Sequence, residues 1–344
     1  MATYCIFRTD RIGDVVLTLP VASVIKLHDP SSRVLFCARE YTAGLLRLCP
    51  DVDEVIVVPE ADTRNPISVA RDARLRSVDV AVFAFPRPGF ALAAVLAGIE
   101  QRVGTARRWY SMLFNHRRHE RRRGGDAHER DYNVRLLDAL GMEIANPPMP
   151  KLRIPPSLDG EARRVLQSAG LTDESRFVVL HPGSGASAVD WPVDMFVRLG
   201  NALTSHYPDL RVLVTGATHE ARLIRSLRDG IGDAAHSLHE VAALPELAAV
   251  LNRAQLVVAN STGPLHIAAA LGVPVLGLYP FRSECNPRRW GPLGPSVAVL
   301  TPPKEKTCSA CAKEACSVHD DMRRIAVEDA LASTRRLLSA QHAG

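Results

Sequence analysis

The chain has 344 residues, 47% hydrophobic content and a mean hydropathy near zero, which indicates a globular protein long enough for two domains with sizeable cores. Seven cysteines spread over this length are not a disulfide framework, and Met1–Asp10 lacks the charged and apolar regions of a secretory signal, so we expect a cytoplasmic protein. The formal net charge of +5 is modest but uneven, because residues 102–123 hold eight arginines and a single acid, Glu120.

Short apolar runs alternate with amphipathic stretches through the first half. The pattern predicts strands at 4–7, 33–37, 54–58, 78–85 and 102–104, and helices at 15–27, 40–48, 66–76, 89–98 and 129–140. Strands that alternate with helices indicate βαβ units and a mostly parallel sheet. Prolines at 147, 148, 150, 155 and 156 then form a stiff connection typical of a domain boundary.

The alternation restarts after this connection. It predicts strands at 177–180, 210–215, 234–237, 256–259 and 275–279, and helices at 158–169, 193–206, 219–228, 244–252, 264–271 and 327–339. We therefore predict an α/β fold with two Rossmann-like doubly wound domains, residues 1–153 and 154–344, and an active site in a cleft between them at the carboxyl ends of strands. The last helix could cross back onto the first domain.

Residues 256–280 carry no formal charge. Gly263-Pro264 and Gly272-Val273-Pro274 interrupt the run, so it is too short for a membrane-spanning helix. A buried strand, a tight loop and a helix starting at Pro264 fit better, and residues 260–266 then form a helix N-terminus suited to an anion. An ordinary turn with a Ser or Thr cap explains the same residues equally well.

The first strand leads into Arg8-Thr-Asp10-Arg-Ile-Gly-Asp14. Asp10 and Asp14 are candidates for a general base, since a carboxylate at the edge of a sheet can accept a hydroxyl proton. Asp14 is equally suited to cap the following helix.

Residues 183–188 read Gly-Ser-Gly-Ala-Ser-Ala after a strand, which matches a dinucleotide-binding G-x-G-x-x-A pattern. The helix starts only at Pro192, and no acid ends the next strand, so the match is accidental. A Gly/Ser loop with backbone N–H groups for a phosphate remains.

These motifs in this order resemble glycosyltransferase family 9, the heptosyltransferases that use ADP-heptose. The resemblance covers nearly the whole chain and rests on the Arg8-to-Asp14 motif, His181-Pro-Gly-Ser-Gly before Trp191-Pro192, Val214-Thr-Gly216 with Glu220, and Asn260 to Pro274. It implies the GT-B fold, an inverting displacement, no required metal or other cofactor, and a lipopolysaccharide-core or related anionic glycan acceptor.

The family's base falls on Asp14, with the acceptor in the first domain and the donor in the second. The resemblance implies donor contacts from the 183–185 loop, the last motif and Glu220, which would bind the ribose, with the backbone near Ala242 beside the adenine. The implied donor residues are Ser184, Gly185, Glu220, Ser261, Thr262, Gly263 and His266; Arg8 and Asp10 are expected at the acceptor. For His266 a role as a satisfied core residue is equally open.

Two positions depart from the family. Val189 stands where many members have a lysine that helps neutralise the diphosphate, and Ser261 stands where many have an aspartate. Arg8, Arg282, Arg288 or Arg289 could replace the missing cation. Another nucleotide sugar or a different acceptor therefore remains an alternative, as does a non-catalytic protein that binds a nucleotide sugar or nucleic acid.

The basic segment 102–123 interleaves arginines with Trp109, Tyr110 and Phe114. Such a segment could grip nucleic acid, or hold an anionic glycolipid and draw the protein to the inner membrane. The glycolipid fits the family, so nucleic acid is not the expected partner, and the expected acceptor contacts are Arg107, Arg108, Arg117 and Arg118. The alternative for the last three arginines of the segment, residues 121–123, is a solvated loop that binds no ligand.

Cys308-x-x-Cys311-x4-Cys316 follows Cys285. This spacing suits a structural metal, with Cys285 completing a four-thiolate set and His319 or Asp321 as substitute ligands. The incomplete pattern and irregular spacing argue against a metal, so none is expected.

Overall fold

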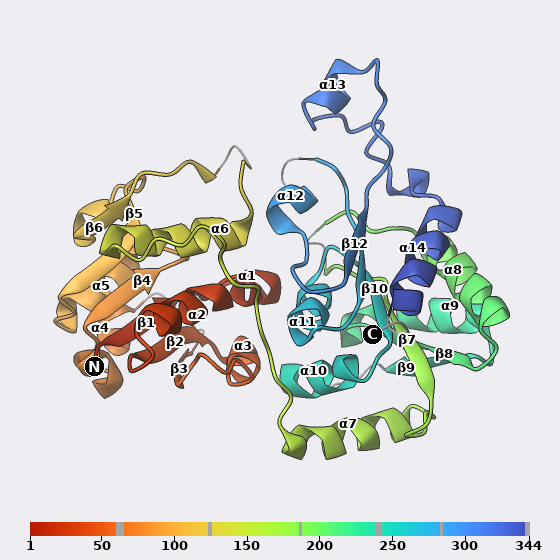
Figure 1. The fold of residues 1–344 in the computed structure, drawn as a ribbon, viewed down its shortest axis with the longest axis horizontal. Helices are drawn as coiled ribbons and strands as arrows, with labels where there is room; N and C mark the ends of the chain where they lie inside the picture. The colour runs from red at the N-terminus through yellow and green to blue at the C-terminus, as the bar shows by residue number, and fades with distance from the viewer. Residues whose placement is uncertain (60–64, 123–125, 186–187, 239–242, 283–284, 341–344) are drawn as a thin grey trace. The chain divides into compact units, whose positions relative to one another are not determined.

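The computed structural model describes residues 1–59, 65–122, 126–185, 188–238, 243–282 and 285–340. The chain forms two compact units, Met1–Arg153 and Ile154–Gly344 (Figure 1). Each unit has its own sheet, and the two are described separately.

Unit 1 contains a parallel six-stranded sheet with the order β3-β2-β1-β4-β5-β6. Its strands are β1 Thr3–Phe7, β2 Arg33–Arg39, β3 Glu54–Val58, β4 Val80–Phe83, β5 Gln101–Thr105 and β6 His116–Arg118. The chain leaves β1 toward β2 on one side and later returns to pair β4 on the other side. The carboxyl ends of β1 and β4 therefore flank a topological switch point, where ligands of such sheets bind.

Helices cover both faces of this sheet. They are α1 Ile12–Val16, α2 Leu19–His28, α3 Glu40–Leu46, α4 Pro66–Ala70, α5 Pro88–Leu96 and α6 Glu129–Val134, with 3-10 turns η2 Ala73–Ser77, η3 Ser111–Leu113 and η5 Arg135–Leu140. Helix α2 packs with α6, and α4 packs with α5. Alternate residues of β1 point to α5, so Cys5 and Phe7 share a core with Phe90, and the Phe7 ring stacks on Phe83 at 4.6 Å.

Unit 2 repeats this topology with the order β12-β11-β10-β7-β8-β9. Its strands are β7 Arg176–His181, β8 Leu210–Thr215, β9 Ala235–Leu238, β10 Leu256–Asn260, β11 Val275–Leu278 and β12 Val297–Leu300. The switch point lies between β7 and β10. The loops after these two strands are the Gly/Ser loop and the 261–263 loop singled out in the sequence.

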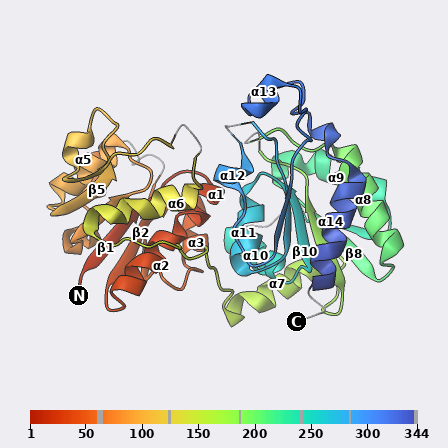
Figure 2. The ribbon, with the colours of Figure 1, turned by 45° about the horizontal axis from the view of Figure 1, so that its top comes forward.

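The helices of unit 2 form two layers. They are α7 Pro156–Ser168, α8 Val193–His206, α9 Ala221–Ile231, α10 Leu244–Asn252, α11 Gly263–Leu271, α12 Pro287–Trp290, α13 Ser309–Ala312 and α14 Val327–Ala340, with 3-10 turns η6 Thr218–Glu220 and η7 Met322–Arg324. Helices α8, α9 and α14 share one face of the sheet, while α7, α10 and α11 pack together on the other (Figure 2).

Helix α14 packs on the sheet of unit 2. Its buried residues Val327, Ala330, Leu337 and Leu338 belong to the core of this unit. The helix contacts α8 and the strands β10 to β12. Its apolar stripe is thus buried on the sheet of its own unit.

The prediction of two Rossmann-like doubly wound parallel sheets is confirmed. Two strands were missed: β6 is three residues long and basic, and β12 is an edge strand whose residues are all half-buried. The helix predicted at 15–27 is two helices, α1 and α2, which meet near Thr18 and Pro20. Within the described residues no helix is both long and apolar enough to span a bilayer.

Candidate active site

A buried arginine gathers carboxylates at the carboxyl end of β1. Arg8 follows this strand, and only 2% of its surface is exposed. Its Nε donates to Asp10 Oδ1 at 2.7 Å, and its terminal nitrogens bond Asp14 Oδ1 and Glu129 Oε1, the latter at 3.2 Å. Three acids around one cation keep Arg8 charged and fix its plane.

Helix α6 supplies two members of this cluster that were missed in the sequence. Asn133 accepts from Arg8 at 3.3 Å and donates to Thr18 Oγ1 at 3.0 Å, while Arg122 donates to Glu129 at 2.8 Å. Glu129 and Asn133 are both buried and four residues apart, so they face the same side of the helix. That spacing was visible in the sequence, but which sheet edge the helix covers was not.

Asp14 lies in the first turn of α1 without capping it: the N-cap residue is Arg11, and it makes no side-chain cap bond. Burial raises the pKa of Asp14 to about 6; the Arg8 guanidinium opposes this rise, and the carboxylates of Asp10 and Glu129 add to it. Arg8 engages Oδ1, and within the described residues Oδ2 accepts no hydrogen bond. A carboxylate with this pKa is suited to take a proton near neutral pH.

The predicted acceptor arginines lie beyond the neighbouring strands. Arg107 and Arg108 are exposed after the carboxyl end of β5, at the same sheet edge as Arg8, which lies at the end of β1. Arg117 and Arg118 lie on β6, where Arg117 donates to the Phe114 carbonyl at 2.7 Å and Arg118 pairs with Asp138 at 3.0 Å. The first two arginines are therefore better placed for a ligand than the second two.

In unit 2, Glu220 closes against the glycines of two loops. Its Oε2 accepts from Ala217 N at 2.9 Å, and its Oε1 accepts from Gly185 N at 3.4 Å. A Cβ added at Gly183 would lie 1.9 Å from Glu220 Oε1, so any larger residue there would push the Glu220 carboxylate aside. The Gly/Ser loop after β7 and the turn after β8 are thereby held together by one carboxylate, and Ser184 is buried beside them.

Asn260 joins the loops at the unit 2 switch point. Its Oδ1 accepts from Trp191 N at 2.9 Å, and its Nδ2 donates to the Pro182 carbonyl at 2.6 Å. The residue is fully buried, so the loops after β7 and β10 are fixed relative to each other. The sequence shows Asn260 only as part of a motif and gives no sign of this bridging role.

Ser261, Thr262 and Gly263 follow and remain partly exposed at the start of α11. Thr262 is the N-cap residue, but its hydroxyl makes no cap bond, and Ser261 hydrogen-bonds Tyr279. His266 is buried within α11. The loop thus presents backbone N–H groups and a threonine hydroxyl at the positive end of a nine-residue helix.

Burial lowers the pKa of His181 to about 4, against the opposing effect of Glu220, so this histidine is neutral. The candidates for the missing lysine are already engaged: Arg282 pairs with Asp320 at 3.0 Å, Arg288 pairs with Glu314 at 2.9 Å, and Arg289 lies over the Trp290 ring. Ala242 lies outside the described residues.

The cysteine prediction requires a correction. Cys308, Cys311 and Cys316 cluster as predicted, but the fourth group among the described residues is His319, and Cys285 is not a member. Asp321 instead caps the η7 turn by accepting from Arg323 N.

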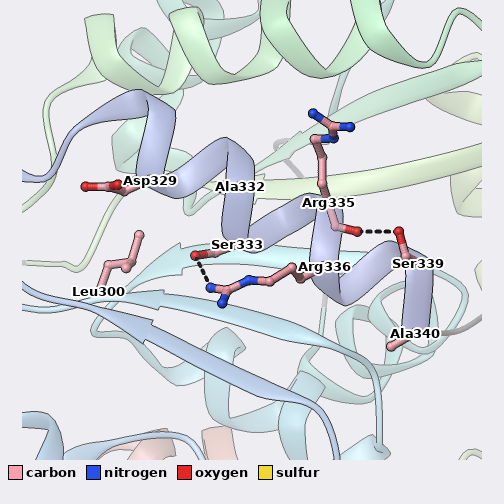
Figure 3. Close-up of a pocket in the computed structure, with 8 residues that line it drawn as sticks. All are labelled: Leu300, Asp329, Ala332, Ser333, Arg335, Arg336, Ser339 and Ala340. Atoms are coloured by element: carbon pink, nitrogen blue, oxygen red, sulfur yellow. Dashed lines mark hydrogen bonds between the residues drawn. The ribbon is translucent and has the colours of Figure 1, made fainter.

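A surface hollow of about 830 Å³ lies along α14 (Figure 3). Leu300 of β12 and the α14 residues Asp329, Ala332, Ser333, Arg335, Arg336, Ser339 and Ala340 line it. None of the residues predicted for the site lines this hollow. The hydrogen bonds drawn in it, such as Arg336 to Ser333 at 3.1 Å, are local to the helix.

Comparison with known proteins shows the family and the fold. The model of glycosyltransferase family 9 (heptosyltransferase) matches residues 90–320. A candidate glycosyltransferase of Haemophilus influenzae is 27% identical over 300 residues, 85% of this chain and 86% of the relative.

Two solved structures share the fold along nearly the whole chain. A family 9 glycosyltransferase from Veillonella parvula superimposes with a TM-score of 0.85 at 21% identity, over 98% of this chain and 97% of the other. The Escherichia coli ADP-heptose lipopolysaccharide heptosyltransferase II gives 0.80 at 18% identity, over 99% and 100%. With the family model matching well over half of its residues, the chain belongs to glycosyltransferase family 9 and is a glycosyltransferase.

Proposed function

We propose that this enzyme transfers heptose from ADP-heptose to an anionic glycan of the lipopolysaccharide-core type, with inversion and with Asp14 as the general base. The observation that carries the mechanism is the cluster around Arg8. It holds one oxygen of Asp14 and leaves the other without a protein donor among the described residues. The raised pKa gives this carboxylate the proton affinity that a base needs.

The proposed step is a single displacement. The acceptor hydroxyl oxygen attacks the anomeric carbon, its proton passes to Asp14 Oδ2, and the bond from the anomeric carbon to the ADP oxygen breaks on the opposite face. Arg8, held by Asp10 and Glu129, fixes the orientation of the Asp14 carboxylate. No metal takes part in this step.

The donor half of the proposal rests on the unit 2 switch point. Thr262 and Gly263 at the start of α11, with Ser184 and Gly185 of the Gly/Ser loop, are proposed to hold the departing diphosphate. Glu220 is proposed to bind the ribose, because its carboxylate already lies against the loop that would carry the phosphates. Fixed N–H dipoles aimed at a developing charge are worth about 3 to 4 kcal/mol each in comparable sites.

The acceptor half rests on unit 1. Arg107 and Arg108 are proposed to meet phosphates or carboxylates of the glycan. After these two arginines in the chain, Trp109 and Met112 expose 80% and 72% of their surfaces. Aromatic and apolar side chains flanked by arginines suit the headgroup region of an anionic bilayer, so we propose that the enzyme works at the cytoplasmic face of the inner membrane.

A different nucleotide sugar is the second candidate, and one observation favours it. Val189, at the position where many family members carry a lysine, is 45% exposed, and the arginines that could replace the cation are engaged elsewhere in unit 2. A nucleotide sugar whose binding needs no cation at position 189 would fit this loop.

The test is release of nucleoside diphosphate from a panel of nucleotide sugars, with a lipopolysaccharide-core acceptor present or absent. We expect acceptor-dependent ADP release from ADP-heptose and its loss in Asp14→Asn. The matched control is Asp194→Asn, which changes an exposed aspartate in the first turn of α8. Faster turnover of another nucleotide sugar would replace the donor assignment, and equal activity of the two variants would remove Asp14 as the base.

A further inference from the structure

Four side chains near the end of unit 2 meet at one point, although none of them belongs to the proposed transfer site. They are Cys308, Cys311, Cys316 and His319, and their sulfur and nitrogen atoms all lie within 4.8 Å of one another. They belong to the segment around α13, which stands apart from the two helical layers of unit 2 (Figures 1 and 2).

The spacings match those of a tetrahedral metal site. His319 Nδ1 lies 3.2 Å from Cys311 Sγ and 3.3 Å from Cys316 Sγ, and the sulfurs of Cys308 and Cys316 are 3.9 Å apart. Zinc bonds of about 2.3 Å to sulfur and about 2.0 Å to nitrogen place two sulfurs about 3.8 Å apart and sulfur and nitrogen about 3.5 Å apart. A disulfide requires about 2.05 Å, and all three cysteines are free thiols.

The segment needs such a centre because its own core is small. Cys311 and Cys316 are buried with a single large side chain, Phe281, which comes from the loop after β11. Helix α13 has four residues, too few to be stable alone. Small folds with so little apolar core usually require a disulfide or a metal.

The backbone is also shaped around the sulfurs. His319 N donates to Cys316 Sγ at 3.4 Å, and the N–H groups of Ala310 and Cys311 point at Cys308 Sγ. Glu314, between the second and third cysteine, has φ +54°, which reverses the chain and returns Cys316 toward Cys311. Donors to sulfur support ligands in their metal-bound form.

We propose that Cys308, Cys311, Cys316 and His319 bind one zinc ion, which is structural. Three sulfurs and one imidazole nitrogen fill a tetrahedron completely and leave no position for substrate, as in closed structural sites. Sulfur and nitrogen donors in this geometry select zinc over magnesium or calcium. The proposal is independent of the donor sugar and of the role of Asp14.

The zinc segment is tied to the loop that follows β11. Asp320 Oδ1 accepts from Phe281 N at 2.6 Å, and Glu314 binds Arg288 at 2.9 Å and Asn286. Arg288 belongs to α12, which ends at Trp290, and the Trp290 carbonyl accepts from Tyr279 OH at 2.9 Å.

Tyr279 in turn hydrogen-bonds Ser261 in the loop that starts α11. The zinc thus fixes the segment that supports one wall of the proposed donor site, without touching the reacting atoms. Removing it should loosen Phe281 and α12 before it affects the sheet.

The experiment measures metal content by mass spectrometry on the purified full-length protein. We expect about one zinc per chain in the wild type and in Cys285→Ser, which changes a cysteine outside the cluster. Cys311→Ser and His319→Ala should lose the metal, whereas His319→Cys should keep it because a fourth thiolate replaces the imidazole. Cobalt exchanged into the wild type should show the strong visible absorption of a tetrahedral thiolate site.

Chelation provides a test that needs no variant. Removing zinc from the wild type should expose residues 304–320 to limited proteolysis, and adding zinc back should restore protection. Wild-type protein that holds no metal after exposure to zinc would overturn the site, and stoichiometric iron would overturn the choice of metal. Loss of zinc in Cys285→Ser, with retention in His319→Ala, would overturn the ligand set.

Discussion

Replacing Asp14 by asparagine should remove activity and leave the protein at least as stable at neutral pH. The folded protein raises the pKa of Asp14 from 3.8 to about 6, chiefly by burial. A rise of about two units means that ionising Asp14 in the fold costs up to about 3 kcal/mol relative to the unfolded chain. Asparagine has nearly the shape of the protonated acid and cannot ionise, so it avoids this cost.

The sign of the pH dependence follows from the same shift. Because the folded pKa lies above the unfolded one, the native state binds the proton more tightly, and protonation stabilises it. This stabilisation is complete below about pH 4 and is lost as the pH rises through about 6. The stability advantage of Asp14→Asn should therefore grow between pH 4 and 6 and stay constant above that range.

Thermal unfolding tests the predicted stability, and ADP release tests the predicted loss of activity. Both are measured on the same preparations at pH 5 and 7.5. Each kcal/mol corresponds to about 2 to 4 °C in Tm for a unit of this size, and loss of a general base costs about 10² to 10⁴ in rate. The exposed Asp194→Asn serves as control, with neither effect expected. A marked fall in Tm for Asp14→Asn would refute the reasoning, because it would show that Arg8 needs this carboxylate more than burial penalises it.

Three further outcomes are expected. The rate of the wild type should fall about tenfold per pH unit below pH 6, as Asp14 is protonated, and a rate at pH 4.5 equal to the rate at pH 7.5 would contradict this. Gly183→Ala should displace Glu220 and raise the KM for the donor several-fold, whereas Gly160→Ala, where the added Cβ meets nothing on an exposed helix, should stabilise by about 0.5 to 1 kcal/mol. Asn260→Ala should cost about 2 to 4 kcal/mol in chemical denaturation, since it leaves a buried N–H and a buried carbonyl without partners.

The sequence determined the fold class because burial on both faces of a parallel strand leaves a continuous apolar run. The runs at β1, β7 and β10 are of this kind, and the proline-rich stretch near 150 separates two such sets. The sequence also placed Asp14 and residues 261–263 at strand ends. It failed at β6 and β12, whose residues at the sheet edges are not fully buried and carry no comparable signal.

Contacts between residues far apart in the chain were decided only by the tertiary structure. Glu129 and Asn133 bond Arg8 although more than 120 positions separate them from it along the chain. Asn260 bonds Trp191 across 69 positions. His319, and not Cys285, completes the group of Cys308, Cys311 and Cys316. Periodicity and spacing report on neighbours along the chain, whereas these partners were chosen by how sheets and helices pack, which no local pattern encodes.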